Sequence, residues 1–188
     1  MQKFVVLIVF LGLLSLPLMA QKVEVFGGYQ FQHLGGDGGS VNVPEGWEAS
    51  LTGFFNKHIG VTGDFSGGYK SETVNEDGVT GSASAHLYTY TGGPVVAFHE
   101  GPINPFVHAL FGGFTIGGNA SGCVTGGNCA SGSASTNGFA MMFGGGVDAK
   151  LNKAIAIRVA QFDWIYYHAN GGSLNQNYRF SSGIVLRF

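Results

Sequence analysis

The sequence predicts an all-β protein, an eight-stranded antiparallel up-and-down transmembrane β-barrel. Three observations lead to this prediction. The chain starts with an apolar segment typical of export, apolar and polar residues alternate from Val23 to Phe188, and only 11% of the 188 residues are charged. A soluble domain usually carries about 25% charged residues. The deficit indicates that much of the protein's surface does not face water.

The first segment has the order of a secretory signal peptide. Lys3 precedes an apolar run over residues 4–14, and the small residue Ala20 follows a break at Ser15 and Pro17. The run is shorter than the roughly 20 residues that a membrane-spanning helix needs. We therefore expect residues 1–20 to be a signal peptide and residues 21–188 to form one outer-membrane β-barrel domain.

Alternation with period two predicts β-strands in the rest of the chain. Three early segments set apolar residues against polar ones: Val23, Val25, Tyr29 and Phe31 against Glu24, Gln30 and Gln32; Trp47, Ala49, Leu51 and Phe55 against Glu48, Ser50 and Thr52; Ile59, Val61, Phe65 and Tyr69 against Thr62, Asp64 and Ser66. Five later segments span residues 83–98, 105–117, 138–151, 155–168 and 177–188. In the seventh segment one alternation cannot place both Arg158 and Asp163 inside, so we expect a bulge there or Arg158 outside at the membrane interface.

The predicted connections alternate in length. Residues 56–58, 99–104 and 152–153 form short turns, whereas four longer stretches rich in Gly, Ser, Asn or Asp read as loops: 35–45, 71–82, 118–137 and 169–176. Outer-membrane barrels have short periplasmic turns and longer extracellular loops. Strands with lipid-facing residues must close into a barrel, because lipid offers no hydrogen bonds to an open edge.

The chain ends on a pattern of polar, glycine and hydrophobic positions formed by Ser181, Gly183, Leu186 and Phe188. With this ending, the export segment and eight strands, the chain resembles the small OmpA/OmpX-type outer-membrane barrels. The resemblance implies that these four residues are an assembly signal, read by the barrel-assembly machinery during insertion. It also implies a place in the bacterial outer membrane, in contact with its lipid.

A secreted β-sandwich is the competing fold, since its strands would also alternate. The low charge, the terminal Phe188 and the aromatic residues at strand ends favour the barrel, because aromatic girdles mark membrane interfaces. These aromatic residues are Tyr29, Trp47, Tyr69, Trp164, Tyr166 and Tyr167.

Cys123 and Cys129 are the only cysteines, within a Gly/Ser/Asn-rich stretch. In an exported protein such a pair predicts a disulfide. A structural zinc site is the alternative, but two cysteines without a nearby histidine supply too few ligands. The six histidines (33, 58, 86, 99, 108 and 168) are scattered, so we expect no metal and no cofactor.

Polar residues on the inward faces predict how the lumen is filled. An eight-stranded barrel is just wide enough for side chains to fill it. The candidates for a lumen polar network are Glu48, Asp64, His86, His108, Asp148 and Arg179. They predict a side-chain plug, since buried charges must pair; a narrow ion path or gate is the functional alternative.

An enzymatic role is disfavoured. Some eight-stranded outer-membrane barrels modify lipid A, and one such deacylase family places His and Ser two residues apart on a strand. Here Asn170 stands where Ser would follow His168, and Ser173 falls in a predicted loop. Without a hydroxyl at that position, His168 has no nucleophile to activate.

The sequence thus predicts a non-enzymatic outer-membrane barrel with a structural or surface-interaction role, a filled lumen and four extracellular loops. A minor solute or ion channel and a lipid-modifying enzyme remain alternatives. Net charge of −2 gives no basic face for nucleic acid. The longest predicted loop, 118–137, presents a surface to an extracellular partner or merely shields the barrel mouth, and composition leaves these two readings open.

Overall fold

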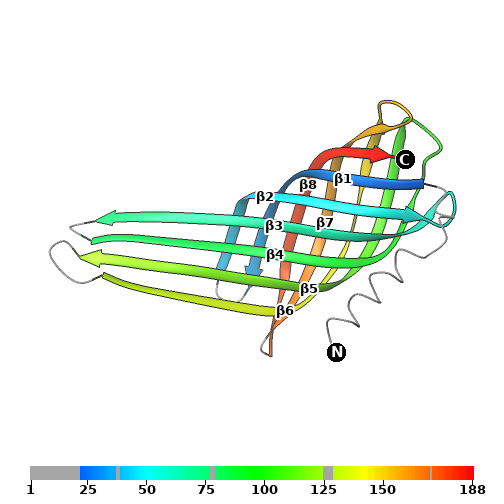
Figure 1. Ribbon diagram of the computed structural model, residues 1–188. Coiled ribbons are helices and arrows are strands. Elements are labelled where there is room, and N and C mark those ends of the chain that lie inside the picture. Colours follow the sequence, from blue (N-terminus) through cyan, green and yellow to red (C-terminus); the bar gives the residue numbers. More distant parts are fainter. Residues whose placement is uncertain (1–21, 37–38, 77–78, 125–128, 170) are drawn as a thin grey trace, which may run out of the picture.

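The computed structural model describes residues 22–36, 39–76, 79–124, 129–169 and 171–188 and contains eight strands closed into a barrel (Figure 1). The strands are β1 (Lys22–Gly36), β2 (Gly39–Phe54), β3 (Ile59–Glu76), β4 (Val79–Ala97), β5 (Ile103–Val124), β6 (Cys129–Lys150), β7 (Ile155–Ala169) and β8 (Gly172–Arg187). Each strand pairs antiparallel with the next, and β1 closes the ring on β8. The predicted barrel is confirmed, and the sandwich is excluded.

Among the described residues, no helix is long and apolar enough to cross a membrane. The predicted signal peptide, residues 1–20, lies outside the described residues.

The alternation sorts side chains between lipid and lumen as predicted. On β1, Val25 and Tyr29 are 37% and 56% exposed, whereas Glu24 and Gln30 are buried. The same division holds on β2, where Leu51 is exposed and Glu48 is buried. Exposed apolar side chains therefore surround the barrel, where the acyl chains of a bilayer would cover them.

The seventh strand contains a bulge, which allows both Arg158 and Asp163 to lie inside. The pairing of β7 with β8 shifts between Arg158 and Gln161, and the pairing of β6 with β7 shifts at Val147. Because one extra residue on a strand reverses the alternation beyond it, Arg158 and Asp163 both point inward and are both buried. Of the two predicted outcomes, the bulge is correct.

The four predicted long loops are wrong as loops. Most of 35–45, 71–82, 118–137 and 169–176 is strand, and the connections at that end of the barrel shrink to 37–38, 77–78, 125–128 and 170–171. These stretches are rich in small polar residues, which are also typical of loops, and this led to the wrong prediction. A ladder is held by backbone hydrogen bonds, however, so Gly, Ser and Ala continue a strand wherever a neighbouring strand continues beside them.

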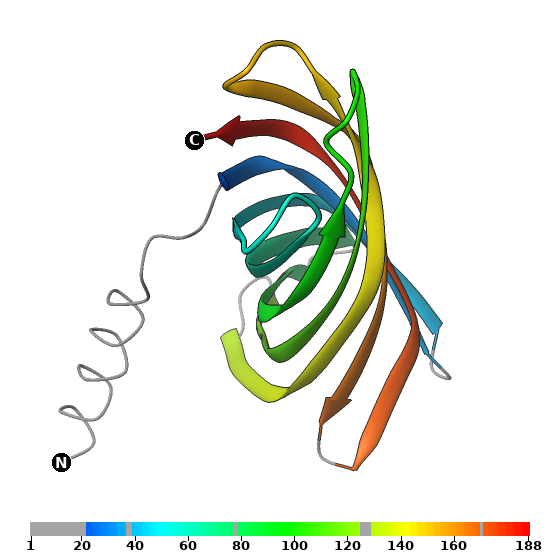
Figure 2. The same cartoon turned by 90° about the vertical axis from the view of Figure 1, so that its right-hand side faces the viewer.

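Four of the strands project beyond the barrel as a sheet that we call the arm, comprising residues 70–76, 79–85, 118–124 and 129–138. Pairing of β2 with β3 ends at Tyr69, and pairing of β6 with β7 begins at Phe139. Past these points β3, β4, β5 and β6 pair only with one another, which gives the long extension seen from the side in Figure 1. Figure 2 looks along this extension from the opposite end of the barrel. The arm therefore has two open edges, on β3 and β6.

The lumen is filled by apolar layers as well as polar ones. The largest apolar cluster joins Leu87, Leu110, Phe114, Ala140, Met142, Ile165 and Tyr167. Two smaller clusters contain Phe26 and Phe54, nearer the strand ends that carry the chain termini. Sequence reasoning assigned the lumen to polar residues alone and did not foresee these clusters.

Candidate functional site

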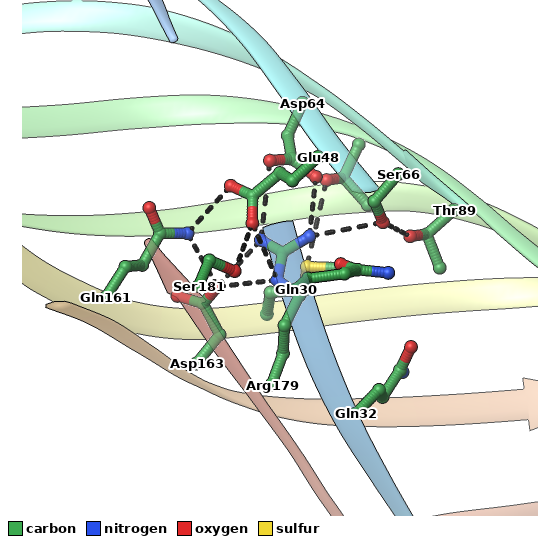
Figure 3. A network of polar contacts seen from close by, with 12 residues as sticks. Gln30, Gln32, Glu48, Asp64, Ser66, Thr89, Gln161, Asp163, Arg179 and Ser181 are labelled. Carbon is green, nitrogen blue, oxygen red and sulfur yellow. Dashed lines mark hydrogen bonds and ion pairs between the residues drawn. The ribbon is translucent and has the colours of Figure 1, made fainter. Parts of the chain in front are cut away.

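A network of buried charges lies at the centre of the lumen, around Arg179 of β8 (Figure 3). Its Nη1 donates to Asp64 Oδ1 at 2.9 Å, and its Nε donates to Asp163 Oδ2 at 2.8 Å. Glu48 Oε2 lies 3.5 Å from the same Nε. Side chains from β2, β3, β7 and β8 thus meet on one guanidinium, whose planar fork suits several carboxylates at once.

Neutral side chains complete this network. Gln161 Nε2 donates to Glu48 Oε1 at 3.0 Å and to Asp163 Oδ2 at 2.8 Å. Ser181 donates to the other oxygen of Glu48. His108 Nε2 lies 2.7 Å from Asp163 Oδ1. Each carboxylate therefore has hydrogen-bond partners, as buried charges require.

A second cluster of charges lies nearer the chain termini. Arg158 Nε donates to Asp148 Oδ1 at 2.9 Å, and the Arg158 guanidinium sits 4.2 Å from the ring centres of both Phe26 and Phe106. Glu24 Oε1 lies 2.7 Å from Arg187 Nε and 2.9 Å from His99 Nε2. Two arginines and two carboxylates balance here, so this cluster is close to neutral.

The space left among these side chains is small. The cavity bordered by the two clusters measures about 20 Å³, which is room for about one water molecule. A wide water-filled pore therefore does not run through this layer of the lumen.

The structure divides the predicted lumen residues into three groups. Glu48, Asp64 and Arg179 meet directly, and His108 joins them through Asp163. Asp148 belongs to the second cluster.

His86 is a correction to the predicted lumen network. Leu87 and Thr89 are the buried residues of β4, so His86 lies on the opposite face, with its ring 5.5 Å from that of Tyr88. The sequence had no marker for the phase of β4, because small residues occupy both faces of its first half.

Several members of the network were not among the predicted site residues. For Asp163 and Arg158 the sequence indicated only that a single alternation cannot place both inside. Glu24 and Gln161 were not among the predicted lumen residues. The signal was available for Glu24, because it alternates with Val23 and Val25 on a strand with an apolar outer face. Gln161 follows the bulge, so its inward direction could not be read from a simple alternation.

The predicted disulfide is present between Cys123 and Cys129. These residues are directly paired across β5 and β6. The bond therefore clamps the last pair of the ladder at the tip of the arm.

The four residues of the C-terminal pattern have individual structural contacts. Ser181 is buried against Glu48, and Leu186 and Phe188 are exposed on the outer face. A Cβ atom on Gly183 would lie 2.3 Å from the carbonyl oxygen of Gly27, so only glycine fits between β8 and β1. Phe188 N donates to Val23 O at 2.8 Å, which closes the barrel seam.

The deacylase-like candidate gains no further support from its surroundings. His168 is exposed and pairs across the ladder with Ser173, whereas Asn170 lies outside the described residues. The ring of His168 stacks on that of Tyr166, 6.4 Å away, among the aromatic residues of the outer surface.

The two open edges of the arm differ in charge. The β3 edge carries Lys70 and Glu72, and Lys70 Nζ lies 2.8 Å from Glu72 Oε1. The β6 edge, residues 129–138, contains no charged residue and no proline. Charges and proline are the usual means of protecting an edge strand from pairing. The β6 edge therefore lacks such protection, and the β3 edge has it.

A closed barrel with a lipid-facing apolar surface and a polar, filled lumen is an integral protein of the bacterial outer membrane. The family model described as the outer membrane protein beta-barrel domain matches residues 6–188. The chain belongs to this family. A search of curated proteins gives no match.

Solved structures show the same fold at low sequence identity. Ail, the attachment invasion locus protein of Yersinia pestis, is 20% identical with a TM-score of 0.60, over 89% of this chain and 98% of that one. A second Ail structure, in complex with the heparin analogue sucrose octasulfate, gives 20% identity and a TM-score of 0.64 over the same shares. Neisserial surface protein A is 15% identical with a TM-score of 0.53, over 88% of this chain and 97% of that one.

Proposed function

We propose that this protein is a non-catalytic surface-interaction barrel, in which the membrane-embedded part is an anchor and the arm binds a partner. The observation that carries the proposal is the open and uncharged β6 edge of an arm clamped at its tip by a disulfide. The arm lies at the end of the barrel opposite to both chain termini, and the extended excursions of outer-membrane barrels are extracellular, so the arm extends away from the cell.

The chemistry of the edge suggests what kind of partner it takes. An extended peptide can add a strand to an open sheet edge, with affinity from main-chain hydrogen bonds. Residues 129–138 offer about ten residues of strand whose side chains are all small or polar. Such small side chains leave room for an extended segment of another protein beside this edge.

Polysulfated sugars fit the outer end less well. Ail has been crystallised with a heparin analogue, whereas the described residues at this end of β2 and β3 include the acidic residues Glu45 and Glu72 beside the basic residue Lys70. Like charges repel across this surface. We expect sucrose octasulfate to show no saturable binding to this protein.

Charging the edge tests the proposal. Ser131→Lys with Ser133→Lys adds two charges to β6, and adhesion of cells displaying the protein to protein-coated surfaces should fall to the level of cells without it. The matched control is Ser82→Lys with Ser84→Lys, which adds the same charges to the same rows of the sheet but on the inner strand β4. The control should keep most of its adhesion.

Two outcomes would count against an interacting β6 edge. Equal loss in both double variants would mean that charge on the arm matters and the edge does not. Wild-type cells that adhere no better than cells lacking the protein would remove the surface role altogether.

The remaining roles concern export and the lumen. We infer that residues 1–20 direct export and that the C-terminal pattern is read during assembly, as the family resemblance implies. The filled lumen supports a permanent plug, so planar-bilayer recordings should show no conductance steps above the buffer background. Lipid A mass spectra should be identical with and without the protein.

A further inference from the structure

An apolar cavity, which we call the cup, lies inside the barrel at the end that carries the arm. It is on the arm side of the charged network around Arg179, which we call the plug. The cup measures about 380 Å³, within the roughly 300–1,000 Å³ range of small-molecule sites. Its walls come from β1, β2, β3, β4, β5 and β8, and its large apolar side chains are Leu34, Val41, Val43, Leu87, Ile116 and Leu174.

Bilayer lipid does not explain why this surface is apolar. Val41 and Leu174 are 45% and 41% exposed, values similar to those of the lipid-facing residues. Yet Leu174 pairs with the buried Tyr167, and Val41 borders the cup, so both lie on the inner side of the ring. An apolar hollow that opens to water is costly, and such surfaces mark binding sites.

The shape of the cup restricts its occupant to a small molecule. The residues that line it come from six of the eight strands, and its floor is packed because Leu34 and Ile116 contact the largest apolar cluster. Below that cluster the lumen is occupied by the Arg179 network. A ligand therefore enters and leaves the cup from the extracellular side. The Arg179 network below it prevents the ligand from passing further into the lumen.

Lys70 is the charged residue among the described residues that border the cup. Lys70 lies in the wall, and its ammonium pairs with Glu72, whose side chain is 65% exposed. An ammonium has three donors, so Lys70 keeps donors for a second carboxylate, and Glu72 is free to turn toward water. An aliphatic wall with one amine matches an unbranched chain that ends in a carboxylate.

From these features we infer that the cup binds an unbranched aliphatic carboxylate, with the chain against the apolar wall and the head group on Lys70. This binding activity is separate from the proposed adhesion, since the cup is on the inner side of the barrel and the β6 edge does not border it.

Equilibrium binding of decanoate and of 1-decanol to the full barrel in nanodiscs tests the inference, with uptake by empty nanodiscs subtracted. Wild type should take up about one decanoate per barrel in a saturable manner. Ala85→Phe fills the cup from β4 and should abolish uptake of both ligands. Ser84→Phe, the matched control, places the same ring on the opposite face of the same strand and should bind like wild type.

Lys70→Met distinguishes the contribution of the carboxylate from that of the aliphatic chain, because it removes the ammonium and leaves the packed barrel unchanged. It should weaken decanoate binding by about tenfold, as expected for one charge-assisted hydrogen bond, and leave 1-decanol binding unchanged. The absence of saturable uptake by wild type, or uptake by Ala85→Phe equal to that of Ser84→Phe, would overturn the cup as a binding site. Equal effects of Lys70→Met on both ligands would overturn the carboxylate.

Discussion

The lumen plug and the arm are held together by different means. In the plug, carboxylates from three strands converge on Arg179 of β8, and hydrogen bonds of 2.8 and 2.9 Å link it to Asp163 and Asp64. In the arm, side chains are mostly Gly, Ala, Ser and Thr, and the sheet is held by its backbone ladder and one disulfide. The difference teaches that the plug depends on residue identity, whereas the arm depends on its length and on its open edges.

The largest expected effect is on the plug. Arg179→Met would leave Glu48, Asp64 and Asp163 without their shared counter-charge in a buried site. Removing one partner of a buried ion pair costs about 3–5 kcal/mol, so the urea midpoint of unfolding in detergent micelles should fall strongly. Lys153→Met, which removes a charge from an exposed turn, should leave the midpoint unchanged. Equal midpoints in the two variants would mean that the plug does not stabilise the barrel.

A smaller effect is expected at the barrel seam. Phe188→Ser should lower the amount of protein inserted in the outer membrane, because the resemblance makes the terminal residue part of an assembly signal. The measurement is the amount of protein in isolated outer membranes whose mobility in SDS gels differs between unheated and heated samples. The control variant Phe188→Tyr should insert like wild type. Full insertion of the serine variant would show that the terminal aromatic ring is not read.

The smallest effect on the barrel is expected from the arm's clamp. Cys123→Ser with Cys129→Ser removes the disulfide at the tip of β5 and β6. Disulfides that close short loops constrain little of the unfolded chain, so the barrel's midpoint of unfolding should stay close to that of wild type. Amide hydrogen exchange should become faster only in the arm, near residues 120–132. A large drop in the midpoint would mean that the arm and the barrel unfold as one unit.

The contrast between the two regions also explains how far the sequence reached. The barrel followed from alternation, because residues such as Val25 and Glu24 differ strongly in polarity and mark the two faces. In the plug, Glu48, Asp64 and Arg179 were predicted on the same basis. The position of Asp163, a further partner of Arg179, depended on whether β7 has a bulge or Arg158 lies outside, and the alternation left both outcomes open. A local sequence pattern does not predict which side chains from distant strands contact one another.

The arm was predicted poorly for the opposite reason. Residues such as Ser84 and Ala85 differ little in polarity, so their alternation is weak and the stretch resembles a loop. The same weakness hid the orientation of His86. Whether small residues form a ladder depends on a partner strand of equal length, and that information lies in the neighbouring hairpin.

Adhesion of an arm-trimmed barrel tests the division between anchor and arm most directly. In this variant residues 70–85 and 116–136 are each replaced by an Asn-Gly turn, which closes the paired strands at Tyr69–His86 and Thr115–Asn137. The trimmed protein should still give the heat-modifiable band of a closed barrel, while adhesion of cells displaying it should fall to that of cells lacking the protein. Undiminished adhesion from a correctly inserted, trimmed barrel would contradict the proposal that the arm carries the surface interaction.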